Sequence, residues 1–241
     1  APDEAIFRGD VWSFTTEPVA YRIEDVAVAS SGISEICAGP ENTVNGSGLN
    51  DADQHSTVSA DMWAASAPAD EPLWLQYEFD RVYKLHELLV WNYNVQFEMI
   101  LGFGLKDVTM EYSADGVEWT TLGDAQFNQA TGKETYVYNT TVDLQGVAAK
   151  YVRLIVNSGF GSMGQYGLSE VRFTYIPVQA REPQPADSET DVDVDATLSW
   201  RAGREAVSHE VYLSTDEGAV AEGAALADVV DQASYMPADL E

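Results

Sequence analysis

The three histidines, the side chains best suited to acid–base chemistry, lie far apart in the sequence. His55 falls in a long polar loop, His86 in an expected strand and His209 in the C-terminal part of the chain. No nucleophile-elbow motif accompanies them, and carboxylate pairs are uninformative among 40 Asp and Glu residues. The single cysteine, Cys37, allows no internal disulfide and completes no zinc ligand set. The sequence therefore favours a protein that is not an enzyme.

Three glycines, Gly159, Gly161 and Gly164, have the spacing of a dinucleotide-binding loop. Such a loop needs a helix after it, because the helix N-terminus holds the pyrophosphate. The residues that follow, 168–173, instead have the pattern of a strand. We therefore interpret the glycine run as a flexible loop at the mouth of a β-sandwich, where Phe160 or Tyr166 reaches a ligand.

Charge excludes two classes of partner. The chain of 241 residues has 12 Lys and Arg against 40 Asp and Glu, a net charge of −28. Nucleic acids and anionic membranes would repel it. No apolar run is long enough for membrane insertion, and residues 1–4 lack signal-peptide features, so export is not involved or the signal has been removed. The acidic surplus fits a surface for salty surroundings, a site for a hard cation, or both.

Apolar residues recur at every second position, which is typical of strands. Val108, Met110 and Tyr112 alternate with polar residues up to a hairpin turn at Asp115 and Gly116. Further strands are expected at residues 26–30, 73–79, 85–93, 151–156 and 169–175, the stretch 85–91 being apolar enough for burial on both faces. The sequence predicts an all-β fold, an antiparallel β-sandwich or jelly roll.

Composition divides the chain into segments. Three prolines and a low apolar content predict an extended linker over residues 177–187, followed by a second, smaller domain over 188–241. Residues 39–69 lack periodicity and are rich in Gly, Asn, Asp and Ser. Long loops of this kind are functional or are ordered by something bound to them.

Short motifs follow one another in a characteristic order over residues 19–176. They are Pro40-Glu41-Asn42-Thr43-Val44-Asn45-Gly46, Trp63, Leu73-Trp74-Leu75-Gln76-Tyr77-Glu78-Phe79, Val90-Trp91-Asn92-Tyr93-Asn94, Lys150-Tyr151-Val152-Arg153-Leu154 and Gly167-Leu168-Ser169-Glu170-Val171. Together they resemble the discoidin or coagulation factor 5/8 type C domain, a galactose-binding-like jelly roll whose relatives include family 32 carbohydrate-binding modules. The resemblance implies a discoidin-like jelly roll that binds a sugar, a lipid or a protein.

The resemblance also implies a structural calcium ion, which in this family pins the long loop with loop oxygens and a carboxylate of the last strand. Asn45 falls where the family usually has Asp, and Glu170 matches the late glutamate. Asp51, Asp53 and Ser56 lie between them in sequence and offer the oxygen ligands that calcium prefers.

Ligand sites of the family lie on loops at one end of the sandwich, beside the calcium loop. The candidate contacts are His55, Trp63, Asn92, Asn94, Gln165 and Tyr166. Amides can bond sugar hydroxyls, and an aromatic ring can cover the C–H face of a pyranose. Core packing is the alternative for Trp63, and loop capping is the alternative for Asn92 and Asn94. Family 32 sites often contain an arginine, which is missing between Arg22 and Arg81 and between Arg81 and Arg153, so galactose-type specificity is in doubt.

Both chain ends resemble parts of a fibronectin type III-like repeat. Residues 188–241, with strands expected at 196–200 and 209–214, resemble its opening, and the segment 1–18 resembles its closing strand through residues 11–16. This strand would fold back onto the C-terminal domain of its own chain or complete that of a neighbour; otherwise the C-terminal domain is incomplete.

We therefore predict a non-catalytic, calcium-stabilised module for carbohydrate binding or adhesion. The resemblance implies an extracellular or cell-surface location within a larger modular protein, with a carbohydrate or another extracellular ligand as partner. The alternative is a structural subunit of a surface layer or fibre, joined to its neighbours by strand exchange between chain ends.

Overall fold

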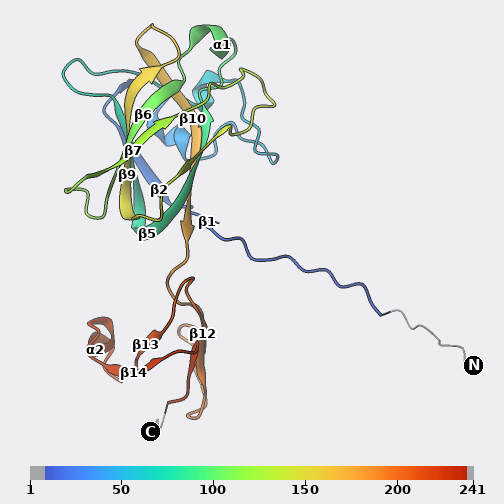
Figure 1. The fold of residues 1–241 in the computed structure, drawn as a ribbon, viewed down its shortest axis with the longest axis vertical. Coiled ribbons are helices and arrows are strands. Elements are labelled where there is room, and N and C mark those ends of the chain that lie inside the picture. Colours follow the sequence, from blue (N-terminus) through green and yellow to red (C-terminus); the bar gives the residue numbers. More distant parts are fainter. Residues whose placement is uncertain (1–8, 238–241) are drawn as a thin grey trace, which may run out of the picture.

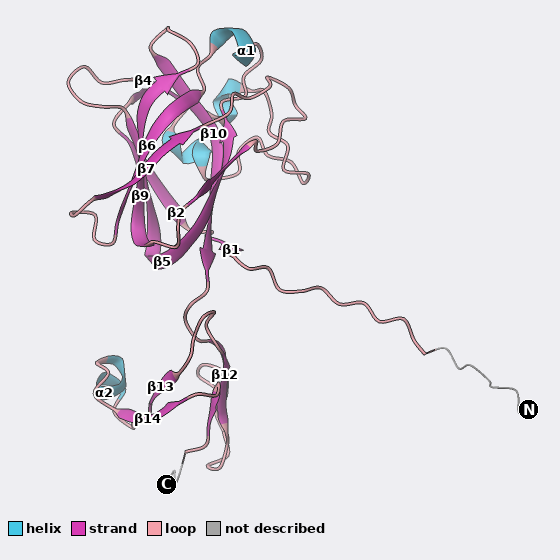
Figure 2. Ribbon diagram, in the orientation of Figure 1, coloured by secondary structure: helices cyan, strands magenta, loops and turns pink. Residues whose placement is uncertain are grey.

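Two β-rich units follow one another along the chain in the computed structural model, which describes residues 9–237 (Figure 1). Most of the regular structure is strand (Figure 2), which confirms the predicted all-β fold. Residues 1–8 of the predicted segment 1–18 and residues 238–241 of the predicted domain 188–241 lie outside the described residues.

The larger unit is an antiparallel network of ten strands within residues 9–237, folded into two layers. The main strand order is β3-β4-β10-β5-β9-β6-β7, while β1 pairs with β10, and β2 and β8 pair with β5. This arrangement is the predicted antiparallel sandwich. The strands are β1 (Tyr21–Arg22), β2 (Val26–Ser30), β3 (Ile33–Ser34), β4 (Trp63–Ser66), β5 (Trp74–Asn92), β6 (Leu105–Ser113), β7 (Thr120–Gln126), β8 (Thr140–Asp143), β9 (Ala148–Gly159) and β10 (Gln165–Ile176).

Strand β5 belongs to both layers. Its first half pairs with β2 and β9, its second half pairs with β10 and β8, and its register with β9 shifts between Glu78 and Tyr83. The sequence predicted separate strands at 73–79 and 85–93. They form one continuous strand, because residues 80–84 between them stay extended across the register shift.

The two faces of β5 differ in burial. Leu75, Tyr77 and Phe79 are at most 1% exposed, as expected for alternate residues that face a core. In the second half, the outward side chains of Glu87 and Leu89 are only half-buried. The prediction that residues 85–91 are buried on both faces is therefore wrong for the outward face.

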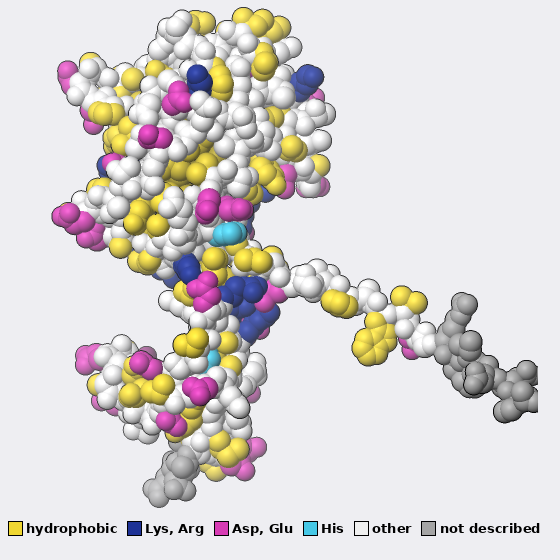
Figure 3. Space-filling model, viewed as in Figure 1, with side chains coloured by type: hydrophobic (Ala, Val, Ile, Leu, Met, Phe, Trp, Pro, Cys, Tyr) yellow, Lys and Arg dark blue, Asp and Glu magenta, His cyan; other side chains and the backbone are white. Residues whose placement is uncertain are grey.

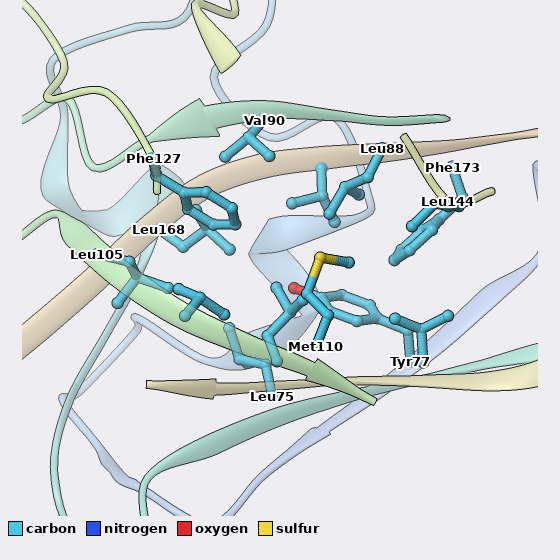
Figure 4. Packing of buried hydrophobic residues seen from close by; sticks show 14 of the residues in the cluster. Leu75, Tyr77, Leu88, Val90, Leu105, Met110, Phe127, Leu144, Leu168 and Phe173 are labelled. Atoms are coloured by element: carbon cyan, nitrogen blue, oxygen red, sulfur yellow. The ribbon is translucent and has the colours of Figure 1, made fainter. Parts of the chain in front are cut away.

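The hydrophobic core lies between the two layers (Figure 4). Phe173 of β10 packs against Tyr77 and Phe79 of β5, with ring centroids 5.1 Å apart in both pairs. Other core residues are Leu75, Leu88, Val90, Leu105, Met110, Phe127, Leu144 and Leu168. Burial of these side chains stabilises the layers and leaves the connecting loops free to carry a site.

The helical segments are short: η1 (Pro40–Thr43), η2 (Ser59–Asp61), α1 (Glu98–Leu101) and α2 (Glu217–Ala221). Both η1 and η2 lie in the predicted loop 39–69, which is ordered in part by its own turns. Among the described residues, no helix has the length and apolarity needed to cross a bilayer.

The smaller unit consists of a three-stranded sheet, β11-β12-β15, and a two-stranded sheet, β13-β14, within the described residues. Its strands are β11 (Arg181–Gln184), β12 (Leu198–Arg201), β13 (His209–Tyr212), β14 (Leu226–Val230) and β15 (Ser234–Tyr235). Strand β11 lies within the predicted linker 177–187, so the linker is shorter than predicted. The likeness of this unit to a fibronectin type III repeat stays a prediction.

Residues 9–18 leave the sandwich as an extended segment without a strand partner within residues 9–237 (Figure 1). Val11, Trp12 and Phe14 are 98%, 88% and 87% exposed. The prediction that residues 11–16 fold back onto the C-terminal domain of their own chain is therefore wrong. The other two alternatives, a neighbour's domain or an incomplete one, are still open.

Candidate functional site

Three loops joined by hydrogen bonds, one of which carries α1, are here named the loop end (Figure 1). The loop end comprises residues 31–38, 94–104 and 159–166. The N–H of Gly161 donates to the carbonyl of Gly102 at 2.6 Å, and the N–H of Phe160 donates to that of Gly104 at 3.3 Å. Gly102 has φ +68°, and a Cβ there would lie 2.4 Å from the nitrogen of Gly161. Glycine at position 102 therefore allows the two loops to touch.

Gln165 and Tyr166, two of the predicted ligand contacts, lie at the loop end and are partly exposed. The Gln165 amide donates to the carboxylate of Glu35. The Tyr166 ring lies against Gly159, where a Cβ would come within 3.3 Å of the ring. This arrangement puts an amide, a carboxylate and an aromatic ring on neighbouring loops.

Large apolar side chains project from the same loops. They are Ile36, Phe97, Met99, Ile100 and Met163, all between 63% and 95% exposed. Exposed apolar groups that gather on one surface mark interaction sites. The sequence predictions missed these residues, although the mainly apolar run over residues 97–101, inside a loop, was a readable signal.

A buried carboxylate holds α1 in place. Glu98 is 0% exposed, and its oxygens accept the N–H groups of Gly104 at 2.9 Å and Phe103 at 3.2 Å. The Gln129 amide donates to the main-chain carbonyl of Glu98 at 2.9 Å. Burial raises the pKa of Glu98, because it disfavours the charged form. These bonds fix the backbone that carries the exposed apolar side chains.

Asn92 and Asn94 are buried, so the prediction that they contact a ligand is wrong. The Asn92 amide donates to the carbonyls of Leu105 at 2.7 Å and Asn128 at 2.9 Å. The Asn94 amide donates to carbonyls of the long loop and to that of Lys133 at 2.9 Å. Both amides tie loops together from inside the fold.

His55 and Trp63 are also 0% exposed, so they do not line the loop end as predicted. The Nδ1 atom of His55 donates to the carbonyl of Ser56 at 3.0 Å, and burial lowers the pKa of His55. Trp63 lies opposite Leu168 in the β4–β10 pairing and belongs to the hydrophobic core. Both side chains position strands and loops.

Glu170 is a fully buried carboxylate with one oxygen that accepts no hydrogen bond. Its Oε2 accepts the N–H of Gly46 at 3.1 Å, beside Asn45, while Oε1 has no hydrogen-bond partner. Atoms of Arg22 and Arg172 lie 3.8 and 3.9 Å from Oε1. Burial raises the pKa of Glu170 to about 7, against the opposing effects of the Gly46 N–H and the two arginines. A buried carboxylate oxygen without a donor fits a bound cation.

The other three predicted calcium ligands point elsewhere. Asp53 pairs with Arg172 at 2.7 Å, and the Ser56 hydroxyl donates to Asp61 at 2.6 Å. Asp51 lies exposed in a turn. Within the part of the chain that the structure describes, no three His, Cys, Asp or Glu side chains gather as a metal site. The five predicted ligands therefore do not form one shell. Glu170 contacts Gly46, the residue after Asn45, while the Asn45 Oδ1 accepts the N–H of Ser47 at 2.8 Å.

Comparison with known proteins gave a family match and several structural likenesses. The model of the F5/8 type C domain matches residues 28–171. A family 32 carbohydrate-binding module from a family 31 glycoside hydrolase of Clostridium perfringens is 15% identical, with a TM-score of 0.49, over 65% of this chain and 95% of that chain. A family 32 module of C. perfringens in complex with galactose is 12% identical, with a TM-score of 0.48, over 65% and 99%. No curated protein matches the chain.

The family match covers most of the sandwich. It begins within β2 and ends within β10, so it includes both layers and the whole loop end. It also extends over more than half of the 241 residues. The chain therefore belongs to the F5/8 type C domain family.

Proposed function

We propose that this chain is a non-catalytic carbohydrate-binding module whose ligand binds at the loop end. The proposal is carried by the juxtaposition of Gln165, Tyr166 and Glu35, which lie on loops fixed by buried contacts. The amide and the carboxylate supply donors and acceptors for sugar hydroxyls, and an aromatic ring can cover a C–H face. No arginine occurs in the three loop-end ranges. We therefore propose recognition through the amide and the carboxylate.

Two substitutions at the loop end test this proposal. Tyr166→Ala and Gln165→Ala should each weaken binding of a glycan chosen on a glycan array by about tenfold, or about 1.4 kcal/mol, because each removes a ligand contact. Isothermal titration calorimetry measures the change. Gln179→Ala is the matched control, since this exposed amide lies beyond β10, at the opposite end of the sandwich.

Two results would count against the proposal. An array without a bound glycan would remove carbohydrate as the ligand class. Full binding by both loop-end variants would move the site away from Gln165 and Tyr166.

A structural calcium ion held by Asn45 and Glu170 is the second part of the proposal. The Oε1 atom of buried Glu170, which accepts no hydrogen bond, supports it. Calcium at about 100 times its dissociation constant adds about 2.7 kcal/mol of stability. For a chain of this size we therefore expect the melting temperature to rise by about 5–10 °C. Differential scanning fluorimetry with calcium and then with a chelator measures the effect.

Matched variants locate the calcium site. Glu170→Gln should abolish the calcium-induced rise, because it removes the charge of the buried ligand. Asp51→Asn removes the same charge from an exposed turn and should keep the rise. A wild-type melting temperature that neither calcium nor the chelator changes would refute the calcium site.

An extracellular or cell-surface location, and a role in adhesion within a larger modular protein, belong to the same proposal. Single modules of this kind bind weakly, and linked copies raise the overall affinity through effective concentration. The test is whether antibodies detect the protein on intact cells or in the medium. Detection only after the cells are broken would contradict this location.

A further inference from the structure

An open groove of about 470 Å³ lies between the two sheets of the smaller unit. Its walls include Trp200 of β12 and His209 and Val211 of β13. The Trp200 and His209 rings are in contact, with centroids 5.2 Å apart, and Nε1 of Trp200 is buried without a hydrogen-bond partner. The groove therefore offers apolar walls together with one unused buried donor.

The sheets beside the groove have open edges. Strands β13 and β14 pair only with each other among the described residues, and β11 and β15 are the outer strands of their sheet. A two-stranded sheet is marginally stable alone, and an unpaired edge is a template for another strand. An added strand would satisfy backbone groups here.

Residues 11–16 have the properties of such a strand. They are extended, and alternation places Trp12 and Phe14 on one side, where both are at least 87% exposed. The segment carries no charge, although 22% of the chain is charged. The groove lining likewise holds one carboxylate, Glu210, and no Lys or Arg. An uncharged aromatic segment thus matches a nearly uncharged groove.

The residue that follows this segment, Glu17, is anchored to the smaller unit of its own chain. Glu17 pairs with Arg181, Arg201 and Arg204. Figure 3 shows basic side chains gathered at the junction of the two units. From this anchor, residues 11–16 extend away from the smaller unit and have no strand partner among the described residues (Figure 1). The segment therefore lies outside the groove of its own chain and is available to a second copy.

We propose that residues 11–16 of one copy of this chain occupy the groove of a second copy. The segment pairs with an open strand edge and inserts Trp12 and Phe14, and Nε1 of Trp200 donates to a carbonyl of the inserted strand. Reciprocal exchange closes a dimer, whereas one-way exchange builds a longer chain of copies. The surface involved is separate from the loop end, so this proposal does not depend on the proposed carbohydrate binding.

Sedimentation of the whole chain over a concentration series tests the proposal. We expect reversible association that a Trp12→Ala/Phe14→Ala double variant weakens by more than about tenfold, because buried aromatic anchors dominate such interfaces. Val117→Ala is the control, since this side chain is 75% exposed in a turn of the sandwich. A wild-type chain that is monomeric throughout, or association that the double variant leaves unchanged, would overturn the proposal.

A complementation experiment tests whether the groove accepts the segment of another copy. Ala206 is an exposed residue of the groove lining, so Ala206→Arg blocks the groove without disturbing a core. Neither this variant nor the double variant should associate alone. An equimolar mixture should form dimers, because the Ala206→Arg copy donates an intact segment to the intact groove of the double variant. A blue shift of Trp12 fluorescence should accompany pairing, and a mixture that stays monomeric would overturn the proposal.

Discussion

Trp63→Ala is expected to lower the free energy of unfolding of the sandwich by about 3–5 kcal/mol. The indole is 0% exposed and lies opposite Leu168 in the core between the layers. Truncation removes its apolar contacts and leaves a cavity that the paired strands cannot fill by moving. Such a loss is a large part of the roughly 5–15 kcal/mol that stabilises a typical domain. Urea denaturation followed by circular dichroism measures it.

Two variants separate core packing from a role in binding. Trp63→Phe keeps an aromatic ring in the core and should recover much of the stability. Trp12→Ala makes the same truncation at a side chain that is 88% exposed, so at high dilution it should leave the sandwich unchanged. A Trp63→Ala protein with wild-type stability and lost glycan binding would restore Trp63 as a ligand contact.

The sandwich could be predicted because its signals are local. Residues 108–113 alternate between apolar and polar side chains, and Asp115 and Gly116 supply the turn to the next strand. Each of these features depends on neighbours in sequence. The continuity of β5 was missed because residues 80–84 are too polar to read as a strand, yet they stay extended between its two halves.

The candidate ligand contacts were only partly predictable, because exposure depends on how distant loops stack. An asparagine amide suits a sugar hydroxyl and a backbone carbonyl equally well. Asn92 and Asn94 donate to the backbone carbonyls of Asn128 and Lys133, which belong to loops further along the sequence. Gln165 and Tyr166 lie at the start of β10, at the end of the sandwich, so they stay partly exposed.

The predicted calcium ligands were only partly predictable for the same reason, because the partners of a charged side chain come from distant parts of the chain. The resemblance brought Asn45 and Glu170 together across more than a hundred residues, and the fold places Glu170 against Gly46, the residue after Asn45. The sequence did not indicate that Arg172 would engage Asp53 or that Arg22 would approach Glu170. Partners that compete for a carboxylate are set by strand register, which a single sequence does not specify.

The two proposed surfaces lie at opposite ends of the molecule, with the loop end beside α1 and the groove in the smaller unit (Figure 1). Exchange of residues 11–16 between copies would therefore leave every loop end free. An assembly would present several weak sugar sites together, and effective concentration would raise the overall affinity. Self-association and carbohydrate binding would then reinforce each other while remaining separable by mutation.

Asn92→Ala is expected to lower the free energy of unfolding by about 3 kcal/mol or more, because the Asn92 amide satisfies buried backbone acceptors through Nδ2 and buried backbone donors through Oδ1. Its Nδ2 donates to the carbonyls of Leu105 and Asn128, and its Oδ1 accepts the N–H groups of Tyr93 at 2.9 Å and Leu105 at 3.0 Å. Asn92 is 0% exposed, so water does not easily replace the lost partners. At about 2–4 °C per kcal/mol, the melting temperature should fall by about 6–12 °C.

Asn157→Ala provides the matched control, because this exposed amide has a single side-chain partner, the Thr109 hydroxyl. Its cost should stay within about 0.5 kcal/mol, as for most surface substitutions. Calorimetric melting of both variants should therefore show a large fall for Asn92→Ala alone. An Asn92→Ala protein that melts like the wild type would contradict the buried network. If that protein also failed to bind glycan, Asn92 would have to reach the ligand after all.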